Sequence, residues 1–142
     1  MLYTPMTKKA MDICFEAHKD QKDKSGQPYV FHPFHLAERM TDEETTIVAL
    51  LHDVVEDTSV TLDDLAAEGF SDSVLEAIAL MTHAPGVNYM DYVAEMKKNP
   101  IAKAVKIADL THNSTLSRLN EITPKDLERV ETYRKAKAFL LG

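Results

Sequence analysis

The segment from Glu44 to Val55 is apolar on nearly every side of a helix. At 3.6 residues per turn, its apolar side chains cover most of the circumference. These side chains are Ile47, Val48, Leu50, Leu51, Val54 and Val55. A helix of this kind is stable only where other elements cover its faces. The chain therefore has to fold around this segment, which we expect to be the central helix of a packed domain.

Helix-period patterns dominate the rest of the chain as well. The other expected helices cover residues 5–18, 33–40, 61–69, 71–82, 88–97, 100–116 and 124–140. Strand-favouring residues alternate only weakly, near Tyr29 to Phe31, and no repeat, linker or low-complexity tract divides the chain. We predict an all-α, single-domain helical bundle of about seven or eight helices that comprises residues 1–142.

Several helix starts carry their own signals. Thr4 and Thr123 each precede a proline, as is typical of an N-cap followed by proline in the first helical position. Thr61 starts another helix, which Gly69 is expected to end. Thr41 and Glu44 have the spacing of a capping box for the central helix.

Composition restricts the class of ligand and the compartment. The chain has a net charge of −7, which argues against a nucleic-acid polymer as partner but leaves room for a small anionic substrate beside a bound cation. Its one cysteine, Cys14, excludes an internal disulfide, and with no signal-peptide pattern this favours the cytoplasm. The longest apolar run, Ile47 to Leu51, is far shorter than the ~20 residues of a membrane span. The oligomeric state stays open.

Four ionisable residues interrupt the central apolar segment. His52, Asp53, Glu56 and Asp57 lie within the sequence LLHDVVEDT. At about 100° per residue, His52 and Glu56 share one helix face and Asp53 and Asp57 share the adjoining one. Crowded carboxylates repel one another, so a positive charge should lie among them. A divalent metal ion is the simplest candidate.

Two further acid or imidazole residues lie in apolar surroundings. Asp109 interrupts the apolar helix residues around it, with Asn113 one turn later, and His32 follows an apolar triplet. Taken singly, such a histidine is most often a hydrogen-bonded core residue, and such an aspartate can be a cap or an ion-pair partner. Together with His52 and Asp53 they form a mixed nitrogen and oxygen ligand set that suits Mn²⁺, Fe²⁺ or Zn²⁺.

Three segments of the chain match a known family in order and spacing. They are KSGQPYVFHP (residues 24–33), ALLHDVVEDT (49–58) and KIADLTHN (106–113). Through them the chain resembles the HD-domain hydrolases related to the hydrolase half of the bifunctional RelA/SpoT alarmone enzymes and to the small alarmone hydrolases. The resemblance extends from Ala17 to Arg118 and implies an all-α fold, in agreement with the helical pattern.

The resemblance also implies roles for individual residues. In that family a His, a His-Asp pair and a later Asp hold one Mn²⁺; the matching residues are His32, His52, Asp53 and Asp109. The Glu-Asp pair that follows is the family's catalytic pair, matched by Glu56 and Asp57. Substrate contacts are implied for Lys24, Ser25 and Asn113. The activity implied is removal of the 3′-diphosphate from guanosine 3′,5′-bis(diphosphate), which gives GDP and pyrophosphate.

One position departs from the family pattern. Members that hydrolyse this nucleotide usually carry arginine before the Lys-Ser pair, where it packs on the purine, and here that residue is Asp23. An anion in place of a planar cation removes a stacking contact and repels phosphate. Two alternatives therefore remain open. One is a phosphohydrolase for another nucleotide or a phosphorylated dinucleotide cofactor, and the other is a sensor module that binds a nucleotide without cleaving it.

Overall fold

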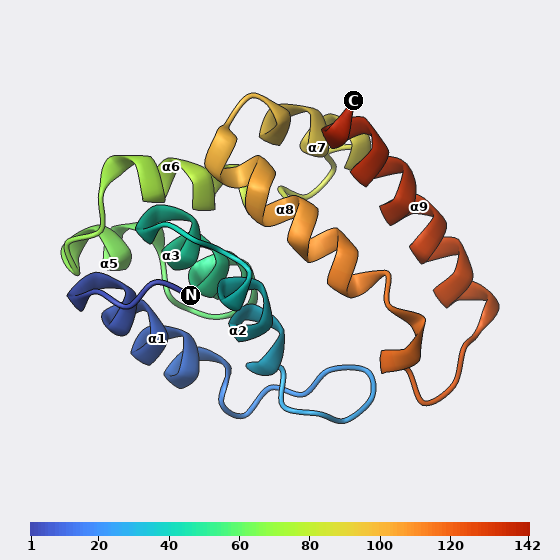
Figure 1. Ribbon diagram of the computed structural model, residues 1–142, viewed down its shortest axis with the longest axis horizontal. Coiled ribbons are helices and arrows are strands. Elements are labelled where there is room, and N and C mark those ends of the chain that lie inside the picture. The colour runs from blue at the N-terminus through green and yellow to red at the C-terminus, as the bar shows by residue number, and fades with distance from the viewer.

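Nine α-helices and one short 3-10 helix make up the computed structural model, which describes residues 1–142 (Figure 1). The first five are α1 (Pro5–His18), α2 (Phe31–Glu38), α3 (Glu43–Leu51), α4 (Val54–Asp57) and α5 (Leu62–Ala67). The others are α6 (Asp72–Met81), α7 (Tyr89–Lys97), α8 (Pro100–Asn113), the 3-10 helix η1 (Leu116–Arg118) and α9 (Pro124–Leu141). The predicted all-α fold is confirmed, and no helix is both long and apolar enough to cross a membrane.

The local start signals explain most helix boundaries. Thr4, Thr61 and Thr123 are N-caps whose side chains accept a backbone N–H of the first turn, as predicted. The capping box expected at Thr41 is wrong. Asp42 is the N-cap of α3, and its carboxylate accepts the Thr45 N–H at 2.8 Å.

The predicted central helix over residues 44–55 is in fact two helices. α3 ends at Leu51 and α4 begins at Val54, so the turn between them contains His52 and Asp53. The His52 ring nitrogen Nδ1 lies 2.7 Å from the Ala49 carbonyl, the acceptor that the Asp53 amide would use in a continuous helix. The break adds one helix to the eight expected. His52 and Asp53 therefore lie in a turn and not on the surface of a regular helix.

Smaller differences lie next to the site. α2 begins at Phe31 instead of residue 33, which places His32 in its first turn. α8 ends at Asn113 instead of residue 116, and a separate 3-10 turn follows. No strand forms near Tyr29; a single bridge between Lys22 and Pro28 closes the loop after α1.

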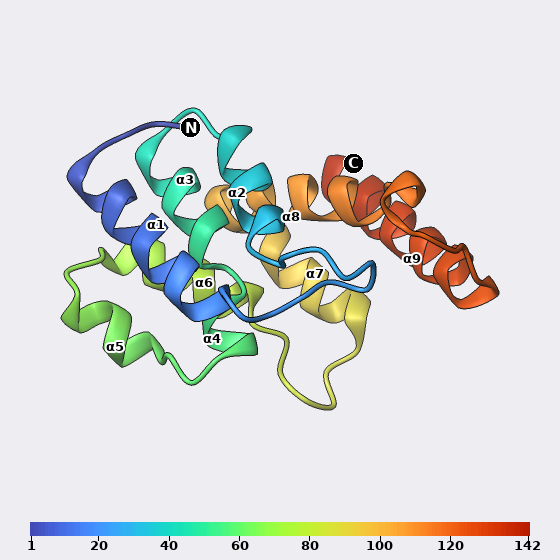
Figure 2. The same cartoon turned by 90° about the horizontal axis from the view of Figure 1, so that it is seen from below.

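The core surrounds α3, which packs against α1, α2, α6 and α8. Its residues Val48 to Leu51 are completely buried, in agreement with their apolar pattern. α8 crosses the molecule from this core to α9, and α1 and α9 lie on opposite sides in both views (Figure 1 and Figure 2). The helices α2, α3 and α8 thus meet near His32, His52 and Asp109.

Candidate metal centre and adjoining pocket

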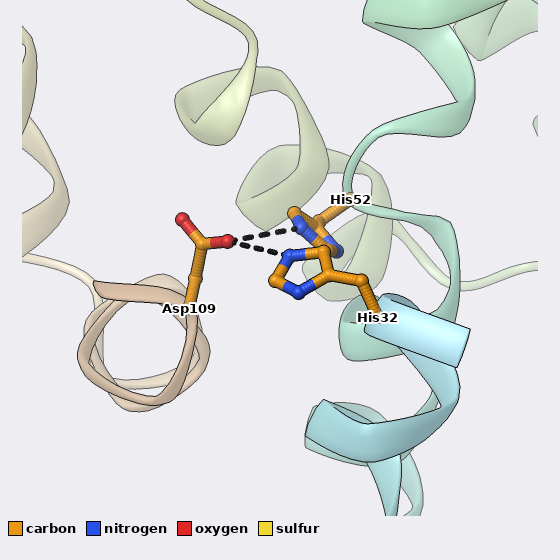
Figure 3. A group of neighbouring side chains, drawn as sticks. All are labelled: His32, His52 and Asp109. Carbon is orange, nitrogen blue, oxygen red and sulfur yellow. Dashed lines mark hydrogen bonds and ion pairs between the residues drawn. The ribbon is translucent and has the colours of Figure 1, made fainter. Parts of the chain in front are cut away.

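Three side chains from separate parts of the chain point toward one another in the interior. His32 comes from α2, His52 from the turn after α3 and Asp109 from α8 (Figure 3). Asp109 Oδ1 lies 2.8 Å from His32 Nε2 and 3.7 Å from His52 Nε2. One donor atom of each residue lies within 4.8 Å of the others, which is close enough for all three to bind one ion.

The surroundings of His52 fit a metal ion. Its side chain is buried, and its Nε2 atom makes no hydrogen bond but lies 3.1 Å from Asp53 Oδ2 and 3.7 Å from Asp109 Oδ1. Nδ1 is directed at the Ala49 carbonyl, so Nε2 is the nitrogen that faces the acids. Burial alone would lower the pKa of His52, but the carboxylates of Asp53 and Asp109 raise it well above its usual value. The two carboxylates thus favour a positive charge at Nε2, which a proton supplies in the free protein and a divalent ion would supply when bound.

Asp53 adjoins this cluster. Its Oδ2 atom lies 3.1 Å from His52 Nε2 and accepts a hydrogen bond from the Tyr29 hydroxyl. Burial would raise the pKa of Asp53, but the neighbouring His52 outweighs it and lowers the pKa to about 2. Asp53 is therefore an ionised carboxylate next to the same nitrogen, but it is not one of the three residues whose donor atoms all lie within 4.8 Å of one another.

A buried lysine that the sequence analysis missed balances the charge of Asp109. Lys106 Nζ lies 3.0 Å from Asp109 Oδ2 and near the rings of Tyr89 and Tyr92, at 5.7 and 5.3 Å from their centroids. Burial would raise the pKa of Asp109, but Lys106 and the two imidazoles hold it well below its usual range. Lys106 precedes Asp109 by three residues, and that spacing was the available signal.

Two more histidines, His112 and His35, form a stack of rings with His32. His112 Nδ1 lies 2.7 Å from His32 Nδ1, and their rings are stacked at 5.0 Å. His35 stacks on the other side of His112 at 3.9 Å. Burial and the nearby Arg118 lower the pKa of His112 to about 3, so this ring is neutral near pH 7. A neutral His112 can hold His32 with its Nε2 atom directed toward Asp109.

Glu56 and Asp57 lie on α4, apart from the three-residue cluster. Glu56 Oε1 accepts the His83 backbone N–H at 2.7 Å, and Asp57 Oδ2 accepts the Gln21 side-chain amide at 3.3 Å. Neither carboxylate makes a hydrogen bond or ion pair with His32, His52 or Asp109. Desolvation is the main cause that raises the pKa of both, with Asp53 adding to it.

A pocket of about 360 Å³ opens beside the cluster. Its walls include His32 and the three residues expected to contact substrate, Lys24, Ser25 and Asn113. Asn113 also donates to Asp109 Oδ1 at 3.1 Å, which links the pocket to the cluster. The Ser25 hydroxyl donates to the Arg118 carbonyl at 2.6 Å, so its proton is already used within the protein.

The pocket also has walls that the sequence analysis did not foresee. They are contributed by η1 and α9 and include Arg118, Arg129 and Tyr133. The helical pattern predicted α9 as a helix. It did not predict that Arg129 and Tyr133 on α9 line the same pocket as residues of the loop after α1. The pocket is thus lined by several cations although the whole chain is acidic.

Comparison with known proteins gives consistent results. A family model described as HD domain matches residues 10–138. The chain is 34% identical over 121 residues to a probable GTP pyrophosphokinase of Mycobacterium leprae, a match that covers 76% of this chain and 15% of that protein. It is 37% identical over 91 residues to a guanosine-3′,5′-bis(diphosphate) 3′-pyrophosphohydrolase of Aquifex aeolicus, covering 61% of this chain and 13% of that protein.

A third relative is the bifunctional (p)ppGpp synthase/hydrolase SpoT of Escherichia coli, 32% identical over 133 residues, with 83% of this chain and 18% of that protein covered. The chain spans less than a fifth of these curated relatives. A solved structure described as a metazoan ortholog of SpoT that hydrolyses ppGpp shares the fold, with a TM-score of 0.76 and 23% identity over 99% of this chain and 88% of that one. Because the family model matches nearly the whole bundle that holds His32, His52 and Asp109, the chain belongs to the HD domain family.

Proposed function

We propose that the chain is a metal-dependent hydrolase that removes the 3′-diphosphate from guanosine 3′,5′-bis(diphosphate). The observation that carries the proposal is the buried cluster of His32, His52 and Asp109, in which His52 Nε2 faces carboxylates, beside a pocket whose lining has more cationic than acidic side chains. The relatives named for this hydrolysis and the shared fold support the choice of nucleotide.

His32, His52, Asp53 and Asp109 are the proposed ligands of one Mn²⁺, and the same ligand types would also accept Fe²⁺ or Zn²⁺. When bound, such an ion acts as a Lewis acid that acidifies water and screens the negative charge on a phosphoryl oxygen. Lys106 donates to Asp109 Oδ2 at 3.0 Å, so Oδ1 would be the oxygen available to the ion.

Glu56 and Asp57 are the proposed acid-base pair. Water attacks the phosphorus attached to the ribose 3′ oxygen, and one of the two carboxylates takes the water proton. The bond from phosphorus to the 3′ oxygen breaks, pyrophosphate leaves, and the 3′ oxygen regains a proton to give GDP. Their raised pKa values suit this role, because a stronger base accepts a proton more readily near neutral pH. Lys24 and Asn113 are the proposed contacts to phosphate and ribose, and Ser25 fixes the loop that carries Lys24.

The test is turnover of guanosine 3′,5′-bis(diphosphate) by the purified chain with Mn²⁺, with products identified by anion-exchange chromatography. We expect GDP and pyrophosphate in equal amounts, and no products from Asp109→Asn. Stable substrate in the presence of wild-type protein and Mn²⁺ would refute the proposed reaction.

Asp23 favours a second candidate, a phosphohydrolase for another nucleotide, because its carboxylate lies in the wall of the pocket. A panel with the adenine counterpart, nucleoside 3′-phosphates and phosphorylated dinucleotides separates the candidates by their kcat/KM values. Tight binding of an intact nucleotide without product would instead identify a sensor.

A further inference from the structure

Arg118 has no role in the reaction proposed above, although it lies in the pocket. It is the last residue of η1, and its side chain is 29% exposed. The same cavity is lined by His32, so one ligand of moderate size can touch both His32 and Arg118.

The edge of the Arg118 guanidinium is already engaged by the protein. One terminal nitrogen donates to the His112 carbonyl at 2.9 Å and approaches the Asn113 side-chain oxygen at 3.4 Å. The other lies 4.0 Å from Asp23 Oδ2. Guanidinium donors lie in the plane of the group, so the hydrogen bonds of one terminal nitrogen and the ion pair of the other restrict the orientation of that plane.

Asp23 is itself fixed in the loop after α1. Its Oδ1 atom accepts the backbone N–H groups of Ser25 at 2.9 Å and Gln27 at 3.0 Å. The Ser25 hydroxyl donates to the Arg118 carbonyl, and the Asn120 side-chain amide donates to the Ser25 carbonyl at 3.2 Å. The loop after α1 and the chain around η1 are more than ninety residues apart in sequence. These two hydrogen bonds join them next to the Asp23–Arg118 pair.

An arginine held in this way has its planar face left for a ligand. With one terminal nitrogen hydrogen-bonded to the protein and the other paired with Asp23, it is poorly arranged to bind a phosphate through both terminal nitrogens. Its face remains suited to stacking on a flat aromatic ring. We propose that Arg118 stacks on the nucleobase of the bound nucleotide and that Asp23 is the residue that positions it. The inference rests on the proposed function for the class of ligand.

The test compares two ligands that undergo no turnover, GDP and inorganic pyrophosphate, by calorimetry on the Mn²⁺-loaded protein. In Arg118→Ala we expect the Kd for GDP to rise about three- to thirtyfold, the scale of a cation–π or stacking contact. The Kd for pyrophosphate, which has no base, should stay within about twofold on the same reasoning, because the face of Arg118 meets only an aromatic ring. Arg134→Ala is the matched control, because Arg134 pairs with Glu131 on an exposed part of α9.

Two further variants keep the test decisive. Arg118→Lys retains a cation that can reach the His112 carbonyl but has no planar face, so it should weaken GDP binding as Arg118→Ala does, even if the alanine variant does not fold. Asp23→Asn retains the Oδ1 acceptor and removes the charge, so GDP affinity should fall by a smaller factor. Unchanged GDP affinity in the Arg118 variants, equal losses for both ligands, or no GDP binding by wild type would each overturn the inference.

The two proposals can fail separately. If wild-type protein binds GDP through Arg118 but releases no pyrophosphate from guanosine 3′,5′-bis(diphosphate), the proposed reaction is wrong and base stacking stands. If turnover is normal and GDP affinity does not depend on Arg118, only the stacking is wrong.

Discussion

At the scale of single residues, the two oxygens of Asp109 have different partners. Oδ2 is held by Lys106 at 3.0 Å, whereas Oδ1 faces His32, His52 and the Asn113 amide. The Lys106–Asp109 pair is almost entirely buried, and in such surroundings an unpaired charge is costly. Lys106 therefore stabilises the carboxylate before an ion binds and directs its other oxygen toward the cluster.

Replacement of Lys106 by methionine tests whether Lys106 stabilises the Asp109 carboxylate in this way. Lys106→Met leaves the Asp109 carboxylate without its cation, and we expect a loss of about 3 kcal/mol in the free energy of unfolding in the presence of a chelator. Saturating Mn²⁺ should recover part of that loss, because the ion takes over the neutralisation. Urea unfolding under both conditions measures the difference.

Lys98→Met is the control, since Lys98 pairs with Glu95 in an exposed position and its loss should cost less than about 1 kcal/mol. An equal loss for Lys106→Met with and without Mn²⁺ would show that Lys106 does not act through the cluster.

At the scale of elements, the break between α3 and α4 separates the proposed ligands from the proposed acid-base pair. α3 and the turn after it position His52, whereas α4 carries Glu56 and Asp57. Each carboxylate is held by a different loop, through the His83 amide or the Gln21 side chain. The short helix α4 thus presents two carboxylates with independent partners.

Glu56→Gln should lower kcat by about 10²- to 10⁴-fold, the usual contribution of a general base. The side-chain carbonyl of glutamine can still accept the His83 N–H, so the metal content should stay near that of wild type. Steady-state kinetics with metal analysis checks both, and Glu95→Gln on the exposed surface of α7 is the control. A normal kcat would remove Glu56 from the chemistry and leave Asp57 as the base.

The pH dependence of kcat provides a separate test of α4. Desolvation, with Asp53 adding to it, raises the pKa of Glu56 and Asp57. A general base acts when deprotonated, so kcat should fall as the pH drops through this raised pKa and be constant above it. We expect the fall of kcat on the acidic side of the pH profile to lie above the ordinary carboxylate pKa of about 4. A fall at or below that pKa would show that neither carboxylate is the base in the environment described here.

The helices themselves could be predicted, but the break in the central one could not. Helical periodicity and the Thr-Pro starts identified α1 and α9 because both signals are local in sequence. In the turn after Leu51 the His52 ring nitrogen Nδ1 lies 2.7 Å from the Ala49 carbonyl, and an apolar sequence pattern does not predict such a contact.

The residues of the three-residue cluster could be predicted from the sequence, but part of the pocket wall could not. The acids and imidazoles stood out because they interrupt apolar segments, and the structure brings His32, His52 and Asp109 together. The contact between Ser25 and Arg118 joins residues distant in sequence, so only the fold reveals it and the pocket wall it forms.

At the scale of the whole molecule, α8 links the three-residue cluster to the pocket. Asp109 on this helix belongs to the cluster, and Asn113 at its end lines the pocket. α3 and α2 pack on one part of α8, and α9 packs beside it. Because the proposed ligands come from separate elements, an ion that binds them also ties these elements together, and binding should stabilise the native state by mass action.

The most direct test of the central claim is the metal stoichiometry of the folded chain. Calorimetric titration with Mn²⁺ after chelator treatment should show one ion per chain in wild type and in the surface variant Glu95→Gln. His52→Ala and Asp109→Asn, each checked for a folded state by circular dichroism, should show no such binding. Failure of wild type to bind a divalent ion, or undiminished binding by both site variants, would contradict the account.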